Sequence, residues 1–442
     1  MSYLEVRNEW CAPGVGGMAG PAPGHLGTLR RSHVVKFPKS FLQCFPGNLV
    51  RRSVRSMQEE DSVGRRIAKY RKLRGMTQLQ LARAAGVGKQ TLAKVESGHA
   101  AASQVWVGYV ATALGVEASL LYGEDSEYPN LDGIIPTVRR VLAATDLLPD
   151  LEPEPLDRLR PLVLRMMEWR HAAAYDKMTK LLPDLTDQLL TATQRDGAEA
   201  YSLLTYAYRA ANTLSHKLGH HDLSMLATDR MVWAASQSDD PLLLATTRYV
   251  KSAALARIGA SAQAIQLTDR TIADVEPLAN DLTGAAVLCA LHMRRAGLAA
   301  TGWDADTTDT HYAEATALAA RVGDREVLGT VVGPTNLKLW EIGSAVDLGR
   351  IGVADQIAET VQLPTSFPRE RQAHFWLDLA RAALVAGKPD KAVDALQEAR
   401  LCAPEYFRHS RAVKTVIKTT AEQQRRASSG LRALANYAGI QD

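Results

Sequence analysis

The sequence predicts an all-α protein in which a small domain of short helices precedes a long array of helix pairs. Three observations predict this fold class. From residue 62 onward, apolar residues recur three and four positions apart. Alternating apolar and polar runs, which are typical of strands, are hardly found. Glycines interrupt the helical pattern of the second part every 40 to 44 residues.

The composition narrows the class of protein. Of 442 residues, 46% are hydrophobic and 23% are charged, which is typical of a soluble globular protein with two or three domains. No apolar run reaches the ~18 residues needed to span a bilayer, and the beginning lacks a secretory signal. We therefore expect a cytoplasmic protein with no membrane partner. The cysteines have no C-x-x-C spacing, so reduced thiols are expected at Cys11, Cys44, Cys289 and Cys402.

Positive charge is concentrated at the front of the chain. Residues 1–57 hold eight Lys or Arg against two Asp or Glu, and residues 58–122 hold nine against five. Since the whole chain has a net charge of +4, the remainder is negatively charged. This asymmetry favours a polyanion as the partner of the first part.

Residues 1–57 predict a disordered basic extension. Segments such as "CAPGVGGMAGPAPGHLG" are rich in Gly and Pro and have no sustained helical or strand periodicity. Such a segment cannot bury enough apolar surface to offset the entropy lost on ordering. It is either an arm that contacts DNA, a tail without a role, or a stretch upstream of a true start at Met57.

Residues 58–123 predict a domain of five helices. Val63, Ile67 and Tyr70 form the apolar stripe of the first helix, with Asp61 or Ser62 as its N-cap. Two later helices are predicted in "SQVWVGYVATALGV" and "EASLLYG", where an apolar stripe closes the core. That stripe consists of Trp106, Val110 and Leu114.

The second and third helices are predicted to form a tight pair. Thr77 and Gln80 have the spacing of a capping box, which begins the second helix, and Gly86 allows the left-handed turn that ends it. Only three residues then precede the third helix, so the two helices must cross steeply, as in a helix-turn-helix.

The third helix has an outer face suited to DNA. Leu92 and Val95 are predicted to face the core. On the opposite side, a glutamine can pair with adenine, a lysine can reach guanine or phosphate, and a small threonine permits close approach to the groove. The segment is therefore predicted to enter the major groove of double-stranded DNA. The candidate contact residues are Lys89, Gln90, Thr91 and Lys94.

These features resemble the phage-repressor-like, Xre-type helix-turn-helix family over Ser62 to Gly123. The matching stretches are "MTQLQLA", "AGVGKQTLAKVESG" and "ALGV". The resemblance implies a five-helix lambda-repressor-like DNA-binding domain in which Gln78 binds a phosphate. It assigns base readout to Lys89, Gln90 and Lys94. It also implies an ion pair between Arg71 and Glu96 that ties the first helix to the end of the third.

The chain departs from the family pattern at two places. The residue opening the recognition helix is commonly Ser or Thr, whereas here it is Gly88, a cap weaker by about a few tenths of a kcal/mol. After Gly98 the family often has a basic residue and a proline, whereas this chain has His99 and "AAAS". We expect a reduced grip on phosphate in that loop.

Residues 124–158 are acidic and rich in proline, and predict a linker with a short helix around 137–144. From residue 159 to 442, Ala and Leu recur at helical spacing, and the glycine period is typical of stacked helix pairs. The expected breaks are at Gly219, Gly259, Gly302, Gly343 and Gly387.

One unit resembles a tetratricopeptide repeat. In "FWLDLARAALVAGKPDKAVDALQEARLCAP" the aromatic, small, turn-glycine and terminal-proline positions of that repeat are filled. The resemblance implies an α-solenoid whose last stretch, residues 405–440, caps the stack. The matching residues are Trp376, Leu379, Ala380, Gly387, Ala392, Leu396, Ala399 and Pro404.

A solenoid of this kind has a concave side lined by the first helix of each pair. Positions ten residues before each break glycine predict which residues line it, and an asparagine in "VVGPTNLKLW" lies nearby. Asparagine suits a peptide backbone because it both donates and accepts. We predict a groove for a peptide or small molecule, the alternative being solvated polar residues on an ordinary scaffold. The candidate groove residues are Arg209, Tyr249, His292 and Asn336.

Chemistry of other kinds is not expected. His216 and His220 are four residues apart, but no glutamate completes a zinc motif and Gly219 should end the helix between them. Nucleophile elbows, Walker loops and dinucleotide fingerprints are absent from the sequence. We therefore expect no metal, no cofactor and no enzymatic activity.

The leading hypothesis is a homodimeric, nucleoid-associated transcription regulator with a ligand-sensing repeat domain. The arrangement resembles bacterial peptide-responsive regulators that join a helix-turn-helix to tetratricopeptide repeats. The alternative hypothesis is an interaction hub, in which DNA contact localises the chain and the repeats recruit a protein partner.

Overall fold

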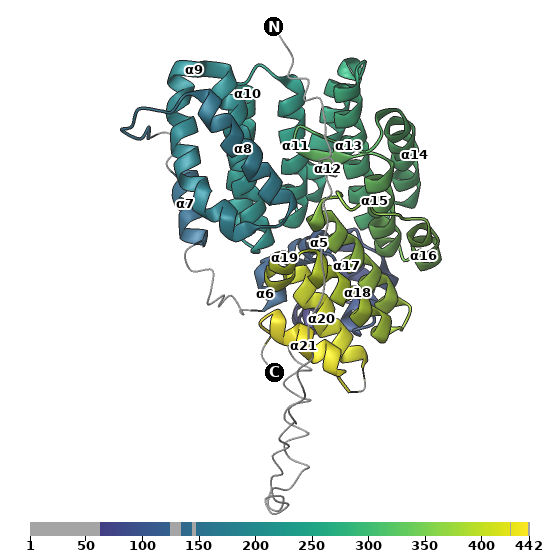
Figure 1. The fold of residues 1–442 in the computed structure, drawn as a ribbon. Coiled ribbons are helices and arrows are strands. Elements are labelled where there is room, and N and C mark those ends of the chain that lie inside the picture. The colour runs from purple at the N-terminus through teal and green to yellow at the C-terminus, as the bar shows by residue number, and fades with distance from the viewer. Residues whose placement is uncertain (1–61, 124–133, 144–146, 425, 441–442) are drawn as a thin grey trace, which may run out of the picture. The chain divides into compact units, whose positions relative to one another are not determined.

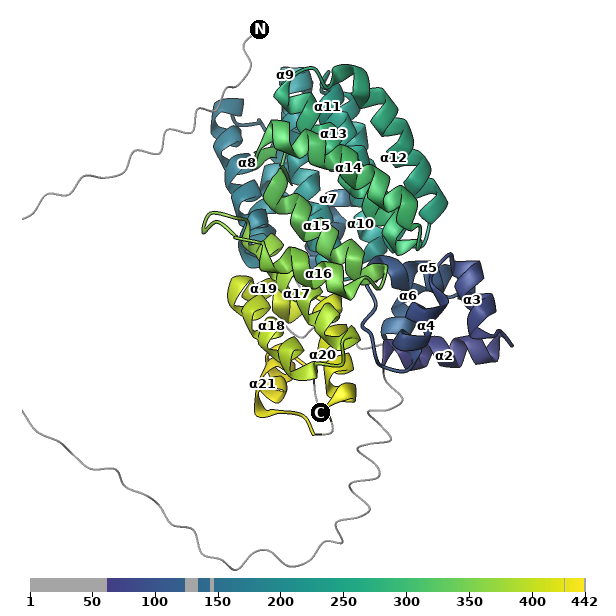
Figure 2. The same cartoon turned by 90° about the vertical axis from the view of Figure 1, so that its right-hand side faces the viewer.

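The computed structural model describes residues 62–123, 134–143, 147–424 and 426–440. The predicted basic extension, residues 1–57, lies outside them. Apart from one short hairpin, every regular element in the described ranges is helical (Figures 1 and 2). The all-α fold class is therefore confirmed.

The first part is the predicted five-helix domain. Its core side chains are fully buried, with Ile67, Leu81 and Leu92 each 0% exposed. These leucines and isoleucine come from three different helices, so burying them fixes the helices against one another. The helices are α2 (Val63–Leu73), α3 (Gln78–Ala85), α4 (Lys89–Glu96), α5 (Gln104–Leu114) and α6 (Ala118–Tyr122).

The predicted linker contributes a helix of its own. Helix α7 (Ile134–Ala143) packs against α9 and α10, and Val138 and Leu142 are buried there. The short helix expected around 137–144 thus begins three residues earlier than predicted. The next helix, α8 (Leu156–His171), packs along α9.

The second part is an array of helix pairs, as expected. Helix α9 (Tyr175–Lys217) is bent at Gly197, whose φ of 55° and ψ of −129° are not helical. Each later pair packs on the next, and the last three helices close the array. The pairs are α9 with α10 (His221–Ser236), α11 (Pro241–Arg257) with α12 (Ser261–Val275), α13 (Leu282–Thr301) with α14 (Ala305–Val322), α15 (Pro334–Asp347) with α16 (Ile351–Glu359), and α17 (Arg369–Val385) with α18 (Pro389–Cys402). A 3-10 turn (Glu276–Leu278) follows α12, and the closing helices are α19 (Pro404–His409), α20 (Arg411–Gln423) and α21 (Ser429–Tyr437).

Four of the five expected break glycines lie at turns between paired helices. Gly219, Gly259 and Gly387 have φ values of 83°, 83° and 68°, which explains why glycine is needed there. Gly302 ends α13, but the left-handed residue of that turn is Trp303, with φ of 63°. The segment that resembled a tetratricopeptide repeat forms a pair of helices, α17 and α18, as predicted.

The expected break at Gly343 is wrong. Gly343 lies inside α15, and the turn after α15 is made by Gly349, with φ of 73°. A Cβ on Gly343 would lie 3.1 Å from the Asp378 carboxylate of α17. The glycine is therefore explained by close approach of α15 and α17, not by a turn.

A β-hairpin, which the sequence pattern did not predict, separates α14 from α15. Strand β1 (Arg325–Val327) pairs antiparallel with β2 (Thr330–Val332). Leu328 and Gly329 form its turn with φ values of 47° and 73°. The hairpin reaches back to α8, where Arg170 donates to the Gly329 carbonyl.

The first domain packs on the repeat array through α5. A Cβ on Gly108 of α5 would lie 2.6 Å from the Arg257 carbonyl at the end of α11, and one on Gly259 would lie 1.8 Å from the Thr112 hydroxyl. Ala256 of α11 belongs to the same apolar cluster as the core of the first domain. These two glycines allow a backbone contact between the parts.

No helix among the described residues is both apolar enough and long enough to cross a membrane.

Candidate nucleic-acid interface and ligand groove

The helix-turn-helix is shaped by the predicted local signals. The Thr77 amide donates to Oε1 of Gln80 at 2.8 Å, and the Gln80 amide donates to the Thr77 hydroxyl at 3.2 Å. Both halves of the capping box are therefore present. Gly86 ends α3 with φ of 61°, the left-handed conformation expected for the turn.

Arg71, Glu96 and Gln78 form a cluster that fixes the recognition helix, α4. Arg71 donates from Nε and Nη2 to the two Glu96 oxygens at 2.6 and 2.9 Å, which confirms the expected ion pair. The hydrogen bond to Glu96 raises the pKa of Arg71. Gln78 Nε2 donates to Glu96 Oε2 at 2.8 Å. The Gln78 amide is thus held at the start of α3 by the end of α4.

The outer face of α4 carries the candidate DNA contacts. Leu92 and Val95 are buried in the core, as expected. Lys89, Gln90 and Lys94 are exposed, whereas Thr91 is half-buried. The structure therefore brings these four candidates together on one short helix, away from its apolar side.

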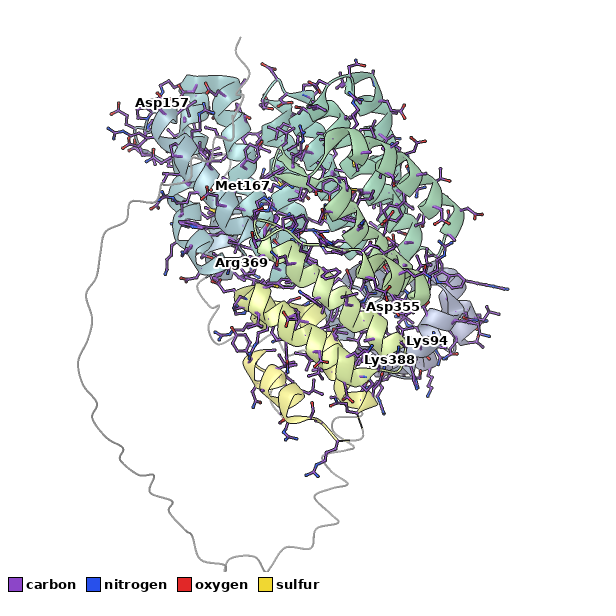
Figure 3. The ribbon with its side chains drawn as sticks, turned by 45° about the vertical axis from the view of Figure 1, so that its right-hand side comes forward. Lys94, Asp157, Met167, Asp355, Arg369 and Lys388 are labelled. Carbon is purple, nitrogen blue, oxygen red and sulfur yellow. The ribbon has the colours of Figure 1, made fainter. Side chains whose placement is uncertain are left out.

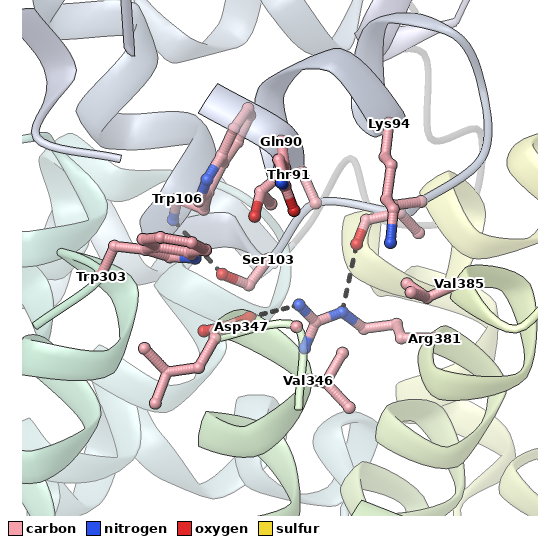
Figure 4. A pocket seen from close by; sticks show the side chains of 15 residues that line it. Gln90, Thr91, Lys94, Ser103, Trp106, Trp303, Val346, Asp347, Arg381 and Val385 are labelled. Carbon is pink, nitrogen blue, oxygen red and sulfur yellow. Dashed lines mark hydrogen bonds and ion pairs between the residues drawn. The ribbon is translucent and has the colours of Figure 1, made fainter. Parts of the chain in front are cut away.

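The same face borders a cavity of about 180 Å³ whose far wall is the repeat array (Figure 4). Gln90, Thr91 and Lys94 lie on one side, and Trp303 and Asp347 lie on the other. Three of the four side chains expected to contact DNA thus line a cavity shared with the repeat array, whereas Lys89 does not.

Gly88, the departure from the family pattern, contacts that far wall. A Cβ on Gly88 would lie 2.5 Å from Cε2 of the Trp303 indole. Gly88 accordingly provides no side-chain cap for α4. A serine or threonine at this position is incompatible with the present distance between α4 and Trp303.

Arg381 joins the floor of the cavity to the loop before α5. Its guanidinium donates to Asp347 at 2.5 Å, to Asp378 at 2.9 Å and to the Ala101 carbonyl at 3.3 Å. Burial disfavours its charge, but the two carboxylates outweigh burial and raise the pKa of Arg381. Gln423 of α20 donates to the Gly98 carbonyl at 3.0 Å.

Trp303, Asp347 and Arg381 were missed by sequence reasoning. One available signal was Trp303 itself, a large aromatic directly after a break glycine and 44% exposed. The two charged residues gave no signal because their pairing depends on how α15 and α17 pack.

In the repeat array, three of the four candidate groove residues contact the hairpin. Arg209 Nη1 donates to the Leu328 carbonyl at 2.9 Å. Asn336 Nδ2 donates to the Val331 carbonyl at 2.7 Å. Tyr249 lies beside the hairpin in an apolar cluster with Val332.

His292, the fourth candidate, lies elsewhere. Its Nδ1 is 2.9 Å from Nδ1 of His311 on α14, so it faces the partner helix of its own pair. Arg294, two residues further along α13, lies instead over the ring of Tyr249 at 4.4 Å and that of Trp340 at 4.8 Å. On α13 it is therefore Arg294, and not His292, that contacts Tyr249.

Met167 of α8, labelled in Figure 3, lies at the tip of the hairpin. A Cβ on Gly329 would lie 2.9 Å from Met167 Cε and 3.3 Å from Arg209 Nη1. Arg170, on the same helix, donates from Nη2 to the Gly329 carbonyl at 2.6 Å. Helices α8 and α9 therefore close over the tip from one side.

Metal ligands do not gather in the described ranges: no three His, Cys, Asp or Glu side chains there form a group that could hold an ion. Helix α9 ends between His216 and His220, and Gly219 adopts a positive φ in the turn that follows, as expected.

Comparison with known proteins places the first domain in a family. Residues 67–121 match a helix-turn-helix family. No curated protein sequence matches the chain. Among solved structures, Bacillus thuringiensis PlcR in complex with the peptide PapR7 and DNA is 15% identical, covering 59% of this chain and 95% of that chain with a TM-score of 0.30. A TM-score of 0.30 does not establish a common fold. Residues 67–121, which contain the capping box, the Arg71–Glu96 pair and the exposed face of α4, are a DNA-binding domain of the helix-turn-helix family.

Proposed function

We propose that this protein is a sequence-specific transcription regulator that binds double-stranded DNA as a homodimer and senses a ligand through its repeat array. The observation that carries the proposal is the exposed face of α4, whose orientation is held by Arg71 and Glu96. In this proposal, residues 58–123 form the DNA-binding domain, residues 124–158 the linker and residues 159–442 the ligand-binding domain.

Each candidate side chain has its own role in the proposed complex. Gln90 pairs with a base in the major groove, with Thr91 small enough to allow close approach, while Lys89 and Lys94 contact guanine or phosphate. The Gln78 amide binds a phosphate with the donor that Glu96 leaves unused. The Glu96 bond orients that amide before DNA arrives.

The present arrangement is closed to DNA in this proposal. A helix that reads bases must enter a major groove about 12 Å wide, with the duplex lying across it. The cavity that Gln90, Thr91 and Lys94 share with Trp303 is only about 180 Å³, which leaves no room for a duplex between α4 and Trp303. DNA binding therefore requires the first domain to separate from the turn between α13 and α14.

A ligand can drive that separation only if it binds the open arrangement more tightly than the closed one. The proposed sensor is the concave groove of the array, where Arg209, Tyr249 and Asn336 already bind a segment of the chain itself. The peptide or small molecule is proposed to act there, without a cofactor or metal.

Selection from a random double-stranded DNA library tests the function. Purified protein should enrich one sequence motif, and a dimer should enrich it as two half-sites about 34 Å apart, one helical turn. The matched control is the variant Lys89→Ala, Gln90→Ala and Lys94→Ala, which should enrich nothing. Recovery of no motif either by the parent protein or by the variant Trp303→Ala, which removes the wall of the cavity opposite α4, would overturn sequence-specific binding. A single half-site would overturn the dimer alone.

A further inference from the structure

The tip of the β-hairpin lies against α8, α9 and the start of α15. Three carbonyls of its backbone accept hydrogen bonds from side chains of three helices. Leu328 O accepts from Arg209 of α9 at 2.9 Å, and Gly329 O accepts from Arg170 of α8 at 2.6 Å. Val331 O accepts from Asn336 at the start of α15 at 2.7 Å. Side-chain donors that bind backbone carbonyls recognise an extended chain whatever its side chains are.

The charged guanidiniums of the two arginines that bind the tip are in an unfavourable environment. Arg170 and Arg209 are 9% and 6% exposed, and among the described residues neither forms an ion pair with a carboxylate. Their partners are carbonyls, the Thr330 hydroxyl at 2.8 Å and the His171 ring at 2.8 Å. Within the described ranges, Arg170 Nε has no hydrogen-bond partner. A charge buried without a direct ion pair is unfavourable, even though Glu326 of β1 acts on both guanidiniums and Glu370 acts on Arg170 from a distance.

The electrostatics of the pair agree with this geometry. Burial first, and then the nearby Arg170, lower the pKa of Arg209 to about 9, with Glu326 opposing the shift. Burial also lowers the pKa of Arg170. A carboxylate in direct contact would oppose both effects more strongly than Glu326 and Glu370 do from a distance, because it can accept two parallel hydrogen bonds from a guanidinium.

The hairpin is held in place against its own backbone preference. Leu328 has φ of 47°, which L side chains rarely adopt, and Gly329 is pressed between Met167 and Arg209. The two ends of the hairpin are close together, since a Cβ on Gly333 would lie 2.5 Å from Cα of Asp324. The tip can therefore leave the groove while the two ends stay joined.

We propose that the hairpin tip is an internal ligand of the repeat array, and that Arg170 and Arg209 form the site at which the carboxylate of a peptide replaces it. The peptide binds with its carboxylate on the two guanidiniums and its backbone along Asn336 and Tyr249. This proposal rests on the ligand-sensing role given to the groove, but it does not depend on DNA binding.

Excision of the hairpin tests the proposal directly. Residues 325–332 are replaced by two glycines, and helix content and melting temperature establish that the variant is folded. The probe is the synthetic peptide Val-Leu-Gly-Thr-Val, which copies residues 327–331, with either a free or an amidated C-terminus; citrate is a third probe. Binding is measured by calorimetry.

The free-carboxylate peptide should bind the excised variant at least tenfold more tightly than it binds the intact chain. It should also bind at least tenfold more tightly than its amidated form. Arg170→Gln and Arg209→Gln should each abolish the difference between the two peptide forms. Arg248→Gln should leave it unchanged, because Arg248 of α11 forms its ion pair with Asp274 of α12. Equal affinity for the two peptide forms, or no binding by the excised variant, would overturn the proposal.

A second measurement uses the intact chain. Hydrogen exchange of the amides in residues 325–332 should become faster when the free-carboxylate peptide is added, because the peptide displaces the tip. Unchanged exchange at saturating peptide would contradict displacement. Faster exchange with citrate alone, without the peptide, would instead assign the site to small carboxylates and contradict peptide recognition. If the DNA selection fails but the peptide binds, the peptide site is supported and only the proposed role as a transcription regulator is overturned.

Discussion

Glu96 shows how one residue can serve both folding and recognition. Its two oxygens accept three hydrogen bonds, two from Arg71 and one from Gln78, and the Glu96 side chain is only 5% exposed. A buried ion pair contributes little net stability, but it fixes orientation because either charge left alone is unfavourable. The pair therefore sets the angle between α2 and α4 and the direction of the Gln78 amide.

Replacement of Gln90 and Gln78 by alanine should have different consequences. Gln90→Ala should cost about 1–3 kcal/mol on the cognate site and relax specificity at one base pair, because a base contact is lost. Gln78→Ala should weaken binding to all sequences alike, because phosphates carry no sequence information. Competition titrations against single-base variants of the selected site measure both. Equal losses across all sequences from both variants would contradict the roles assigned to them.

At the scale of single elements, glycines differ in what they require. Gly197→Ala should destabilise the protein by about 1–3 kcal/mol, since φ of 55° with ψ of −129° is open almost only to glycine. Gly352→Ala, within helix α16 and with open space around it, should instead stabilise by up to about 1 kcal/mol. Urea unfolding of the two variants provides the comparison. A neutral Gly197→Ala would mean that the bend in α9 is not needed for the fold.

The contact between α9 and α17 should make the array sensitive to acid. Lys217 forms an ion pair with Glu370 and lies 2.7 Å from Nε2 of His374. Burial first, and then Lys217, lower the pKa of His374 to about 4, with Glu370 opposing the shift. Burial opposes the charge of Glu370, but Lys217 and His374 outweigh it and hold its pKa well below the usual range.

Both groups bind fewer protons in the folded state than in the unfolded state, so stability should fall as pH falls. For His374 the loss should run from its unfolded pKa of about 6.5 down to about 4, and for Glu370 it should begin below its unfolded pKa of about 4.3. His374→Gln should reduce the slope between pH 6.5 and 4 by the share of one histidine and leave the decline below pH 4.3. The remaining slope comes from the other histidines whose pKa values are lowered, which are His171, His216, His220, His221, His292, His311 and His409. Denaturant melts across this range test it; an unchanged slope in the variant would contradict the assignment.

The accuracy of sequence interpretation differs between elements for a physical reason. The capping box of α3, the turn at Gly86 and the inward residues Leu92 and Val95 were predicted because their signals lie within a few residues of one another. The hairpin was not predicted, because its three-residue strands are held by Arg170 and Arg209 from distant helices.

Ambiguity in what one residue type implies explains two further errors. Gly343 carried the right spacing for a break, but glycine serves close helix approach as well as turns. His292 was selected by counting back from a turn, yet a shift of two residues along α13 changes the face by about half a turn. Arg294 therefore occupies the position for which His292 was proposed.

At the scale of the whole molecule, helix α11 connects the groove to the first domain. Tyr249 packs beside the hairpin, and two turns later Arg257 and Gly259 meet Gly108 and Thr112 of α5. Helix α13 makes a second connection of this kind. Arg294 of α13 contacts Tyr249, and the turn at the end of α13 carries Trp303. Exchange of the hairpin tip for a peptide would therefore act on the two elements that support the closed arrangement.

The closed arrangement can be tested through Trp303 and Gly88 together. Trp303→Ala removes the wall opposite α4, and Gly88→Ser forces the wall away, because a Cβ there would lie 2.5 Å from the indole. Each variant should raise the affinity for the selected DNA site, by tenfold for every ~1.4 kcal/mol of docking energy lost. Fluorescence anisotropy with labelled DNA measures the gain. Leu401→Ala, an exposed apolar residue elsewhere, is the control and should change nothing.

The double variant decides whether the gain comes from this contact. If both substitutions open the same contact, the second should add little to the gain in DNA affinity that the first produces. A double-mutant cycle should then give an interaction energy close to the smaller of the two single effects. Additive gains would show that the two act separately, for example through a better cap on α4 at Gly88→Ser and a relaxed backbone at Trp303, where φ is 63°. Unchanged DNA affinity in both single variants would contradict a closed arrangement, and the repeat array would then have to act on DNA binding by another route.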